Sequence, residues 1–188
     1  KVLINHGLTP QEIFFYRFLI AYLGIWVISP KRLFAGNWKD ELWLMAGGFF
    51  GGSLYFFTEN TALGITQASN VAFIICTAPL LTTILSLLFY KSEKATKGLI
   101  YGSILALIGV GLVVFNGSFV LKLSPVGDLL TLLAALSWAF YSLVIKKMTG
   151  RYPTVFITRK IFFYGVLTIL PAFLLHPLQP DFDVLLKP

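Results

Sequence analysis

The feature that most constrains this chain is a series of long apolar runs separated by short polar links. A helix needs about twenty mostly apolar residues to cross a hydrocarbon core of roughly 30 Å. We predict spanning helices over six runs, namely 11–29, 42–64, 68–90, 97–115, 126–147 and 157–176. The strands of a membrane barrel are alternating segments of only about ten residues, so a barrel fits poorly. The predicted fold class is all-α, a polytopic transmembrane helix bundle with about six helices in this chain.

The composition excludes a water-soluble domain. Hydrophobic residues make up 57% of the chain and charged residues 12%, whereas soluble domains contain roughly 45–50% apolar and about 25% charged residues. A soluble fold of 188 residues could not bury this much apolar surface. We therefore expect the lipid bilayer to be the main partner of the chain.

Basic residues alternate between the links and predict the orientation of the helices. The links 30–41, 91–97 and 146–153 hold nine Lys and Arg residues, and the intervening links and the two ends hold three. The positive-inside rule places such basic links in the cytoplasm. The prediction is a multi-pass protein of the plasma membrane, which in bacteria is the inner membrane. This topology accounts for most of the net charge of +7, so we do not expect a nucleic-acid partner.

Two ionisable residues inside predicted spans are the first candidates for function. Arg17 and Glu59 each lie within an apolar run, where a charge costs about 2.5–3.5 kcal/mol at the bilayer centre. At 1.5 Å per residue, they lie about 9 Å and about 7.5 Å from the outer ends of their helices. We predict that they face each other in the outer half of the bundle, either as an ion pair or as alternate contacts for a charged substrate. Alternatively, they form a permanent structural pair, or Arg17 extends to the outer headgroups.

Further polar and aromatic residues could line a cavity. Tyr55 and Asn60 neighbour Glu59, and Asn70 and Thr77 lie on the run 68–90. Such side chains also serve as hydrogen bonds between membrane helices, and that interpretation remains open. In the same run, Pro79 removes a backbone hydrogen bond and should kink the helix.

The run 126–147 contains a third candidate group, Ser137, Trp138 and Tyr141. Because Trp and Tyr prefer the membrane interfaces, a group near mid-depth is unusual. It could line a cavity for an amphipathic or aromatic metabolite, or simply pack against other helices. Gly47, Gly48, Gly51 and Gly52 form two overlapping GxxxG patterns, and Gly98 and Gly102 form another, which predict close helix contacts.

Four stretches resemble the drug/metabolite transporter superfamily, and specifically its EamA-type members. They are Thr9-Pro10 leading to Arg17-Phe18; Ala62-Leu63 with Ala68-Ser69-Asn70; Thr77-Ala78-Pro79-Leu80 with Glu93; and Gly127-Asp128-Leu129-Leu130 through Ser137-Trp138 to Lys146-Lys147. Their order and spacing are more specific than any one stretch, and the resemblance covers nearly the whole chain.

The resemblance implies a ten-helix fold of two inverted repeats of five helices. This chain would then be a fragment that holds helices two to seven. Residues 1–124 would be the first repeat without its first helix, and residues 125–188 the truncated start of the second. The implied function is secondary transport of small metabolites by alternating access, with export the favoured direction and amino acids or drug-like compounds as possible substrates.

Other classes of function have less support in the sequence. His176 and Asp181 have the H-x4-D spacing of lipid acyltransferases, but Pro177 and Pro180 interrupt the segment. We therefore do not expect an enzyme, a bound cofactor or a metal site; one cysteine, Cys76, offers no thiol cluster. A membrane scaffold or assembly protein remains an alternative, and the sequence does not define the oligomeric state.

Overall fold

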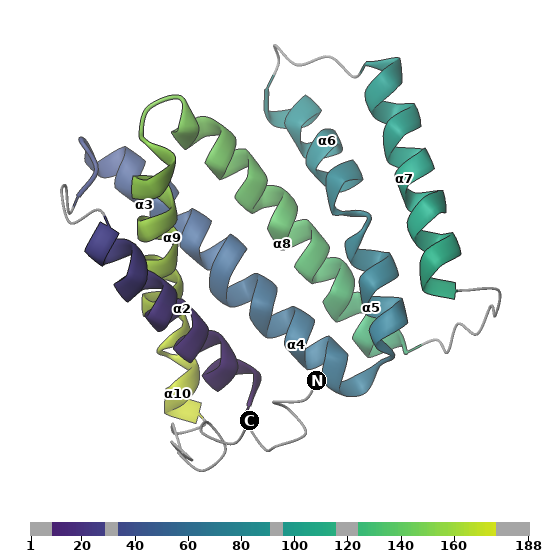
Figure 1. Ribbon diagram of the computed structural model, residues 1–188, viewed down its shortest axis with the longest axis horizontal. Helices are drawn as coiled ribbons and strands as arrows, with labels where there is room; N and C mark the ends of the chain where they lie inside the picture. Colours follow the sequence, from purple (N-terminus) through teal and green to yellow (C-terminus); the bar gives the residue numbers. More distant parts are fainter. Residues whose placement is uncertain (1–8, 29–33, 91–95, 116–123, 176–188) are drawn as a thin grey trace.

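The computed structural model describes residues 9–28, 34–90, 96–115 and 124–175, and over these residues the chain is helical (Figure 1). Six helical runs follow one another. They are α2 (Pro10–Ile28); α3 (Trp38–Gly48), the π-helix η1 (Phe49–Leu54) and α4 (Tyr55–Ile65) in direct succession; α5 (Ala68–Ile75) and α6 (Ala78–Phe89); α7 (Lys97–Phe115); α8 (Pro125–Thr149); and α9 (Thr154–Ile169) with the short α10 (Ala172–Leu175). The predicted all-α bundle is confirmed.

Several helices begin or end at residues other than those predicted. The second helix begins at Trp38, not at 42, because the side chain of Asn37 accepts a hydrogen bond from the backbone N–H of Asp40 at 2.7 Å and caps it. Residues 38–41 are therefore helical and not part of a link. Likewise, α8 runs to Thr149, so Lys146 and Lys147 lie in its last turn, where cations interact favourably with the helix dipole.

Four helices of the described chain are long and apolar enough to cross a membrane: Gln11–Ile28, Ala68–Phe89, Pro125–Thr149 and Thr154–Leu174. The predicted runs 42–64 and 97–115 are also helical. In Figure 1, α2, α6 and α8 end, and α3, α7 and α9 begin, at the same end of the bundle. This alternation matches the predicted topology, and we call this end the basic end.

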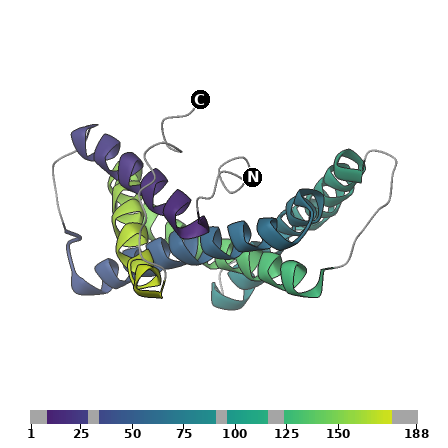
Figure 2. The ribbon, with the colours of Figure 1, turned by 90° about the horizontal axis from the view of Figure 1, so that it is seen from below.

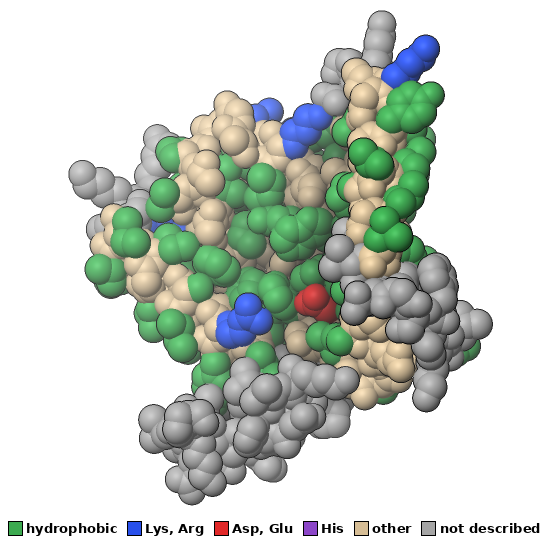
Figure 3. All heavy atoms as spheres, turned by 45° about the vertical axis from the view of Figure 1, so that its right-hand side comes forward, with side chains coloured by type: hydrophobic (Ala, Val, Ile, Leu, Met, Phe, Trp, Pro, Cys, Tyr) green, Lys and Arg blue, Asp and Glu red, His purple; other side chains and the backbone are tan. Residues whose placement is uncertain are grey.

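The helices form an open, concave layer. Seen from below, one arm contains α2 and α9, the other contains α7, and the arms meet along α4 and α8 (Figure 2). The space-filling view in Figure 3 shows hydrophobic side chains gathered toward the middle of one face, most of its Lys and Arg side chains near the upper end, and one basic and one acidic side chain in the lower half. A polytopic membrane protein is expected to carry its charges this way, because charged groups are costly in lipid.

Four glycines bring the second helical run against α8 and α9. A Cβ atom at Gly48 would lie 2.9 Å from the backbone nitrogen of Gly165, and one at Gly47 would lie 3.1 Å from Val144. A Cβ at Gly51 would overlap the ring of Tyr141. The predicted close contact is thus made within the chain. At Gly98 and Gly102 of α7, by contrast, a Cβ would meet no described atom within 4 Å.

The run 68–89 is interrupted at Cys76 and Thr77, directly before Pro79 in the first turn of α6. The Thr77 hydroxyl donates to the carbonyl of Ile74 at 2.7 Å. The predicted break at Pro79 is therefore present, and the local hydroxyl satisfies one of the carbonyls near it. The π-helix in the neighbouring run was not expected from the sequence.

The glycine contacts yield a test with a matched control. Gly48→Ala should lower the free energy of unfolding by about 1–3 kcal/mol, because the new methyl group overpacks a contact with backbone atoms. Gly102→Ala should leave stability unchanged or raise it by up to about 1 kcal/mol, because alanine favours the helix and the site is open. Thermal unfolding of both full-length variants in detergent measures the difference. Equal stabilities would contradict the close contact.

Candidate functional site

A polar-aromatic cluster joins several of the residues expected from the sequence. It consists of Arg17 on α2, Tyr55 and Glu59 on α4, and Trp138 and Tyr141 on α8. The Tyr55 hydroxyl donates to Glu59 Oε1 at 3.2 Å. The Tyr55 and Trp138 ring centroids are 5.0 Å apart, and so are those of Trp138 and Tyr141. The structure thus brings together residues from three helical runs that are far apart in sequence.

Arg17 completes the cluster through an aromatic ring. Its guanidinium carbon lies 5.4 Å from the ring centroid of Phe56, which in turn packs edge-on against Tyr55 at 5.0 Å. Arg17 is close enough to act electrostatically on Glu59, but no ion pair within 4.0 Å joins these two described residues. Arg17 is exposed and Glu59 is half-buried. Neither charge is therefore neutralised by a direct ion pair with the other.

The remaining candidates make other contacts or lie at other positions. The Asn60 amide donates to the carbonyl of Phe56 in its own helix at 2.7 Å, and the Thr77 hydroxyl donates to the carbonyl of Ile74 at the end of α5 at 2.7 Å. Ser137 donates to the Phe50 carbonyl at 2.7 Å and so links α8 to η1, which is a packing role. Asn70 is buried on α5, and Pro79 is exposed at the start of α6.

A second group of charges, missed in the sequence, joins α3 to the start of α9 at the basic end. We call it the α3–α9 clamp: Asp40, Glu41, Arg151, Tyr152, Lys160 and Tyr164. Asp40 is only 3% exposed. It accepts from Arg151 Nη1 at 2.8 Å and from the Tyr152 hydroxyl at 2.9 Å. Tyr152 in turn accepts from the backbone N–H of Gly36 at 2.9 Å.

Glu41 is the other acidic residue of the clamp. It forms an ion pair with Lys160, accepts a hydrogen bond from the Tyr164 hydroxyl, and accepts from the backbone N–H of Ala35 at 2.7 Å. Burial raises the pKa of the Glu41 carboxyl, but Lys160 and these hydrogen bonds outweigh burial, so its pKa lies below the ordinary value. Lys160 is 3% exposed, and the pair is therefore a buried one.

The sequence did contain a signal for the clamp. Arg159 and Lys160 lie inside the predicted span 157–176, and the rule that selected Arg17 and Glu59 applies to them equally. Both are buried, at 2% and 3% exposure. The partner carboxylates were harder to find, because Asp40 and Glu41 lay in a segment assigned to a link. Their distance from Lys160 in sequence exceeds one hundred residues, so only the tertiary packing reveals the pairing.

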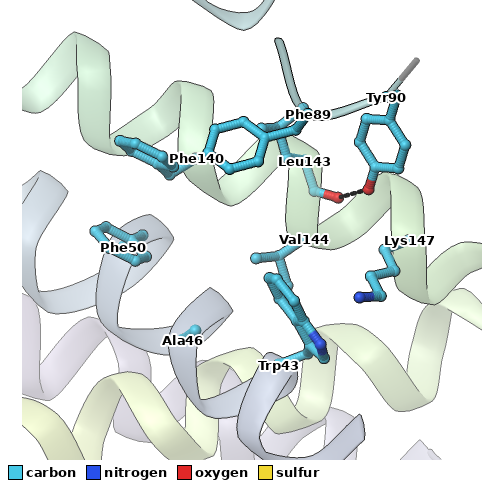
Figure 4. Close-up of a pocket in the computed structure, with 9 residues that line it drawn as sticks. All are labelled: Trp43, Ala46, Phe50, Phe89, Tyr90, Phe140, Leu143, Val144 and Lys147. Carbon is cyan, nitrogen blue, oxygen red and sulfur yellow. Dashed lines mark hydrogen bonds between the residues drawn. The ribbon is translucent and has the colours of Figure 1, made fainter. Parts of the chain in front are cut away.

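An aromatic pocket lies near the clamp, between α3, α6 and α8. Its volume is about 390 Å³. Figure 4 shows its lining residues: Trp43, Ala46, Phe50, Phe89, Tyr90, Phe140, Leu143, Val144 and Lys147. None of them was a candidate in the sequence, where a Phe or Trp in an apolar run resembles any other lipid-facing residue.

The described residues show no group of three or more His, Cys, Asp or Glu side chains that could hold a metal ion. Cys76 is partly buried with a free thiol. His176 and Asp181, the alternative acyltransferase pair, lie outside the described residues. The absence of a cofactor stays a prediction from the sequence.

Comparison with known proteins identifies relatives of this chain. The family model described as the EamA-like transporter family matches residues 1–115. The chain is 32% identical over 151 residues to the uncharacterized transporter YdfC of Bacillus subtilis (strain 168), covering 78% of this chain and 47% of that protein. It is 29% identical over 168 residues to an uncharacterized transporter of Archaeoglobus fulgidus, covering 87% of this chain and 57% of that protein. The chain thus spans about half the length of these relatives.

A solved crystal structure shares the fold. It superposes with a TM-score of 0.70 at 18% sequence identity, and the match covers 93% of this chain and 61% of the other. At this identity, the likeness concerns the arrangement of helices alone.

The buried ion pair of the clamp predicts that removing one partner destabilises the protein much more than removing both. Glu41→Gln should lower the free energy of unfolding by about 3–5 kcal/mol, because Lys160 is left as an unpaired buried charge. The double variant Glu41→Gln with Lys160→Met should recover most of this loss. Lys39→Gln, which changes an exposed neighbour, should alter stability by less than about 0.5 kcal/mol. Thermal unfolding of the full-length variants measures all three.

Low pH should also weaken the ion pair between Glu41 and Lys160 and so lower the stability of the protein. Because the pKa of Glu41 is lowered in the folded state, its contribution is present at neutral pH and is lost as the pH falls below the ordinary value of 4.5. The double variant should lack this part of the pH dependence. A double variant as unstable as the single one, or as sensitive to acid as the parent, would contradict the pairing.

Proposed function

Because the chain belongs to the EamA-like transporter family, we propose that it forms part of a secondary transporter that exports small metabolites across the plasma membrane. The chain is a multi-pass membrane protein, and the proposed mechanism is alternating access. Amino acids and drug-like compounds are the substrate classes that we propose to test. The observation that carries the proposal is the polar-aromatic cluster, which brings together two charges and three aromatic rings from three helical runs.

The cluster has the chemistry of a substrate site. Charges inside a membrane protein are costly, and they are usually found facing a bundle interior or a pathway. Arg17 can contact an anionic group, and Glu59, oriented by Tyr55, can contact a cationic group. Trp138 and Tyr141 offer ring faces to an apolar body. A site of this kind suits zwitterionic or amphipathic metabolites better than purely apolar ones.

The α3–α9 clamp is suited to hold one end of the transporter closed. By the positive-inside rule the basic end faces the cytoplasm, and the polar-aromatic cluster then lies toward the outer side. The clamp ties α3 to α9 with two buried carboxylates, whereas no ion pair among the described residues closes the cluster. We propose that these ends open alternately, so that breaking the clamp exposes the site to the cytoplasm.

No bound cofactor is needed for this cycle. A gradient of substrate or of a coupling ion, or simple exchange, can supply the energy. Glu59 is our candidate for carrying a coupling proton, because a half-buried carboxylate that forms no ion pair with another described residue can bind and release one.

Efflux measurements test the proposal. Cells that express the full-length protein are loaded with labelled amino acids and drug-like compounds, and loss of label is followed over time. Glu59→Gln and Arg17→Gln should each slow efflux of a transported compound about tenfold or more, because each removes a charged contact. Thr61→Val on the same helix is the control, since its hydroxyl donates only to the carbonyl of Phe57 at 2.6 Å.

Each outcome has a definite meaning when membrane abundance is matched. If the parent exports a compound and the two variants do not, transport and the role of the cluster are supported. If the variants export as well as the parent, the charges are structural and the proposed site is wrong. If the parent moves no compound of a broad panel, the scaffold alternative replaces the transporter.

A further inference from the structure

The aromatic pocket between α3, α6 and α8 has an apolar end and a cationic end. In Figure 4, Phe50 and Phe140 lie on one side and Lys147 on the other, with Leu143 and Val144 between them. The Phe50 and Phe140 rings stack at 5.3 Å, and Phe89 packs edge-on against Phe140 at 6.3 Å. The pocket can therefore hold an apolar group at one end and a charged group at the other.

Lys147 is available to a ligand. Its Nζ atom lies 3.8 Å from the ring centroid of Trp43, which holds the side chain at the edge of the pocket. Of the described residues, no acidic one lines the pocket. The ion pairs found among the described residues involve Arg151 and Lys160, both in the clamp, and not Lys147. The Tyr90 hydroxyl already donates to the Leu143 carbonyl at 3.2 Å, and the Lys147 ammonium is the charged donor of the site.

We propose that this pocket binds small amphipathic anions, with the apolar body among the aromatic rings and a carboxylate or phosphate on Lys147. Small-molecule pockets commonly measure about 300–1,000 Å³, and the observed volume of 390 Å³ falls at the lower end of that range. Such a space accommodates one compact molecule, but not both chains of a phospholipid.

The position of the pocket links it to the proposed function, on which this inference rests. Lys147 lies in the last turn of α8, at the basic end, and Trp43 follows Glu41 of the clamp by two residues on α3. A substrate arriving from the cytoplasm would meet the pocket before the polar-aromatic cluster. The pocket thus selects amphipathic anions as the substrate class of the exporter.

Neighbouring Lys146 provides a matched control. Its Nζ lies 3.4 Å from the Ser86 hydroxyl, and it lines a different, smaller cavity with Thr82, Thr83 and Ser142. The two lysines carry the same charge at the same end of α8, but only Lys147 lines the aromatic pocket. A general attraction of anions to this end would depend on both lysines equally, whereas a specific site would depend on Lys147.

The test is a binding measurement on the full-length protein in nanodiscs of phosphatidylcholine. Isothermal titration calorimetry compares 4-phenylbutyrate, 4-phenylbutanol and 4-phenylbutylamine, which share one apolar body and differ in charge. We expect the anion to bind about tenfold tighter than the alcohol and the amine. Lys147→Gln should abolish this preference, and Lys146→Gln should keep it. Ala46→Leu should weaken the binding of all three by filling the pocket, in protein that remains monodisperse.

Several results would overturn the proposal. Equal affinities for the three compounds would do so, as would an anion preference that survives Lys147→Gln or is lost equally with Lys146→Gln. Loss of phenylbutyrate binding in nanodiscs that contain phosphatidylglycerol would show that a lipid headgroup occupies the site. Because binding is measured without transport, the two proposals can fail separately: binding without efflux would contradict the transporter, and efflux without anion-selective binding would contradict this pocket.

Discussion

The close approach of one helical run to two others is the contact on which the rest of this structure depends. The run Trp38–Ile65 lies against both α8 and α9, and Gly47, Gly48, Gly51 and Gly52 permit the short distance. In lipid, helices gain little from hydrophobic burial against one another, so close packing and hydrogen bonds must hold them. The same run carries Glu41 at one end and Glu59 toward the other. The position of this run against α8 and α9 therefore fixes where both the clamp and the polar-aromatic cluster lie.

The two charged groups are stabilised in different ways. In the clamp, each buried carboxylate has a cationic partner and at least one phenolic hydroxyl, so the desolvation of the charges is offset locally. In the polar-aromatic cluster, Arg17 lies over a ring and Glu59 accepts from one tyrosine, so both keep capacity for another partner. A protein that only needed stability would have little reason to leave this second group incompletely paired.

The sequence predicted the helices well because each apolar run is far longer than any competing element. It also predicted that Tyr55 would lie near Glu59, since Tyr55 is one helical turn away. Trp138 and Tyr141 were selected as a separate group on α8, without a link to Glu59. The Asp40 and Glu41 contacts were beyond reach, because they depend on how α3 meets α9 across more than one hundred residues. The aromatic pocket was also missed, because three runs contribute to it and no single run shows a distinctive pattern.

The π-helix Phe49–Leu54 sets the angular relation between the two ends of its run. A π-turn holds one more residue than the α-helical turn it replaces, and one residue corresponds to about 100° of rotation about the helix axis. Trp43 and Tyr55 therefore do not point in the relative directions that an uninterrupted α-helix would give them. Helical-wheel diagrams drawn across this run would assign its second half to the wrong neighbours. In a relative with one residue fewer here, the polar face of α4 would point toward a different part of the membrane protein.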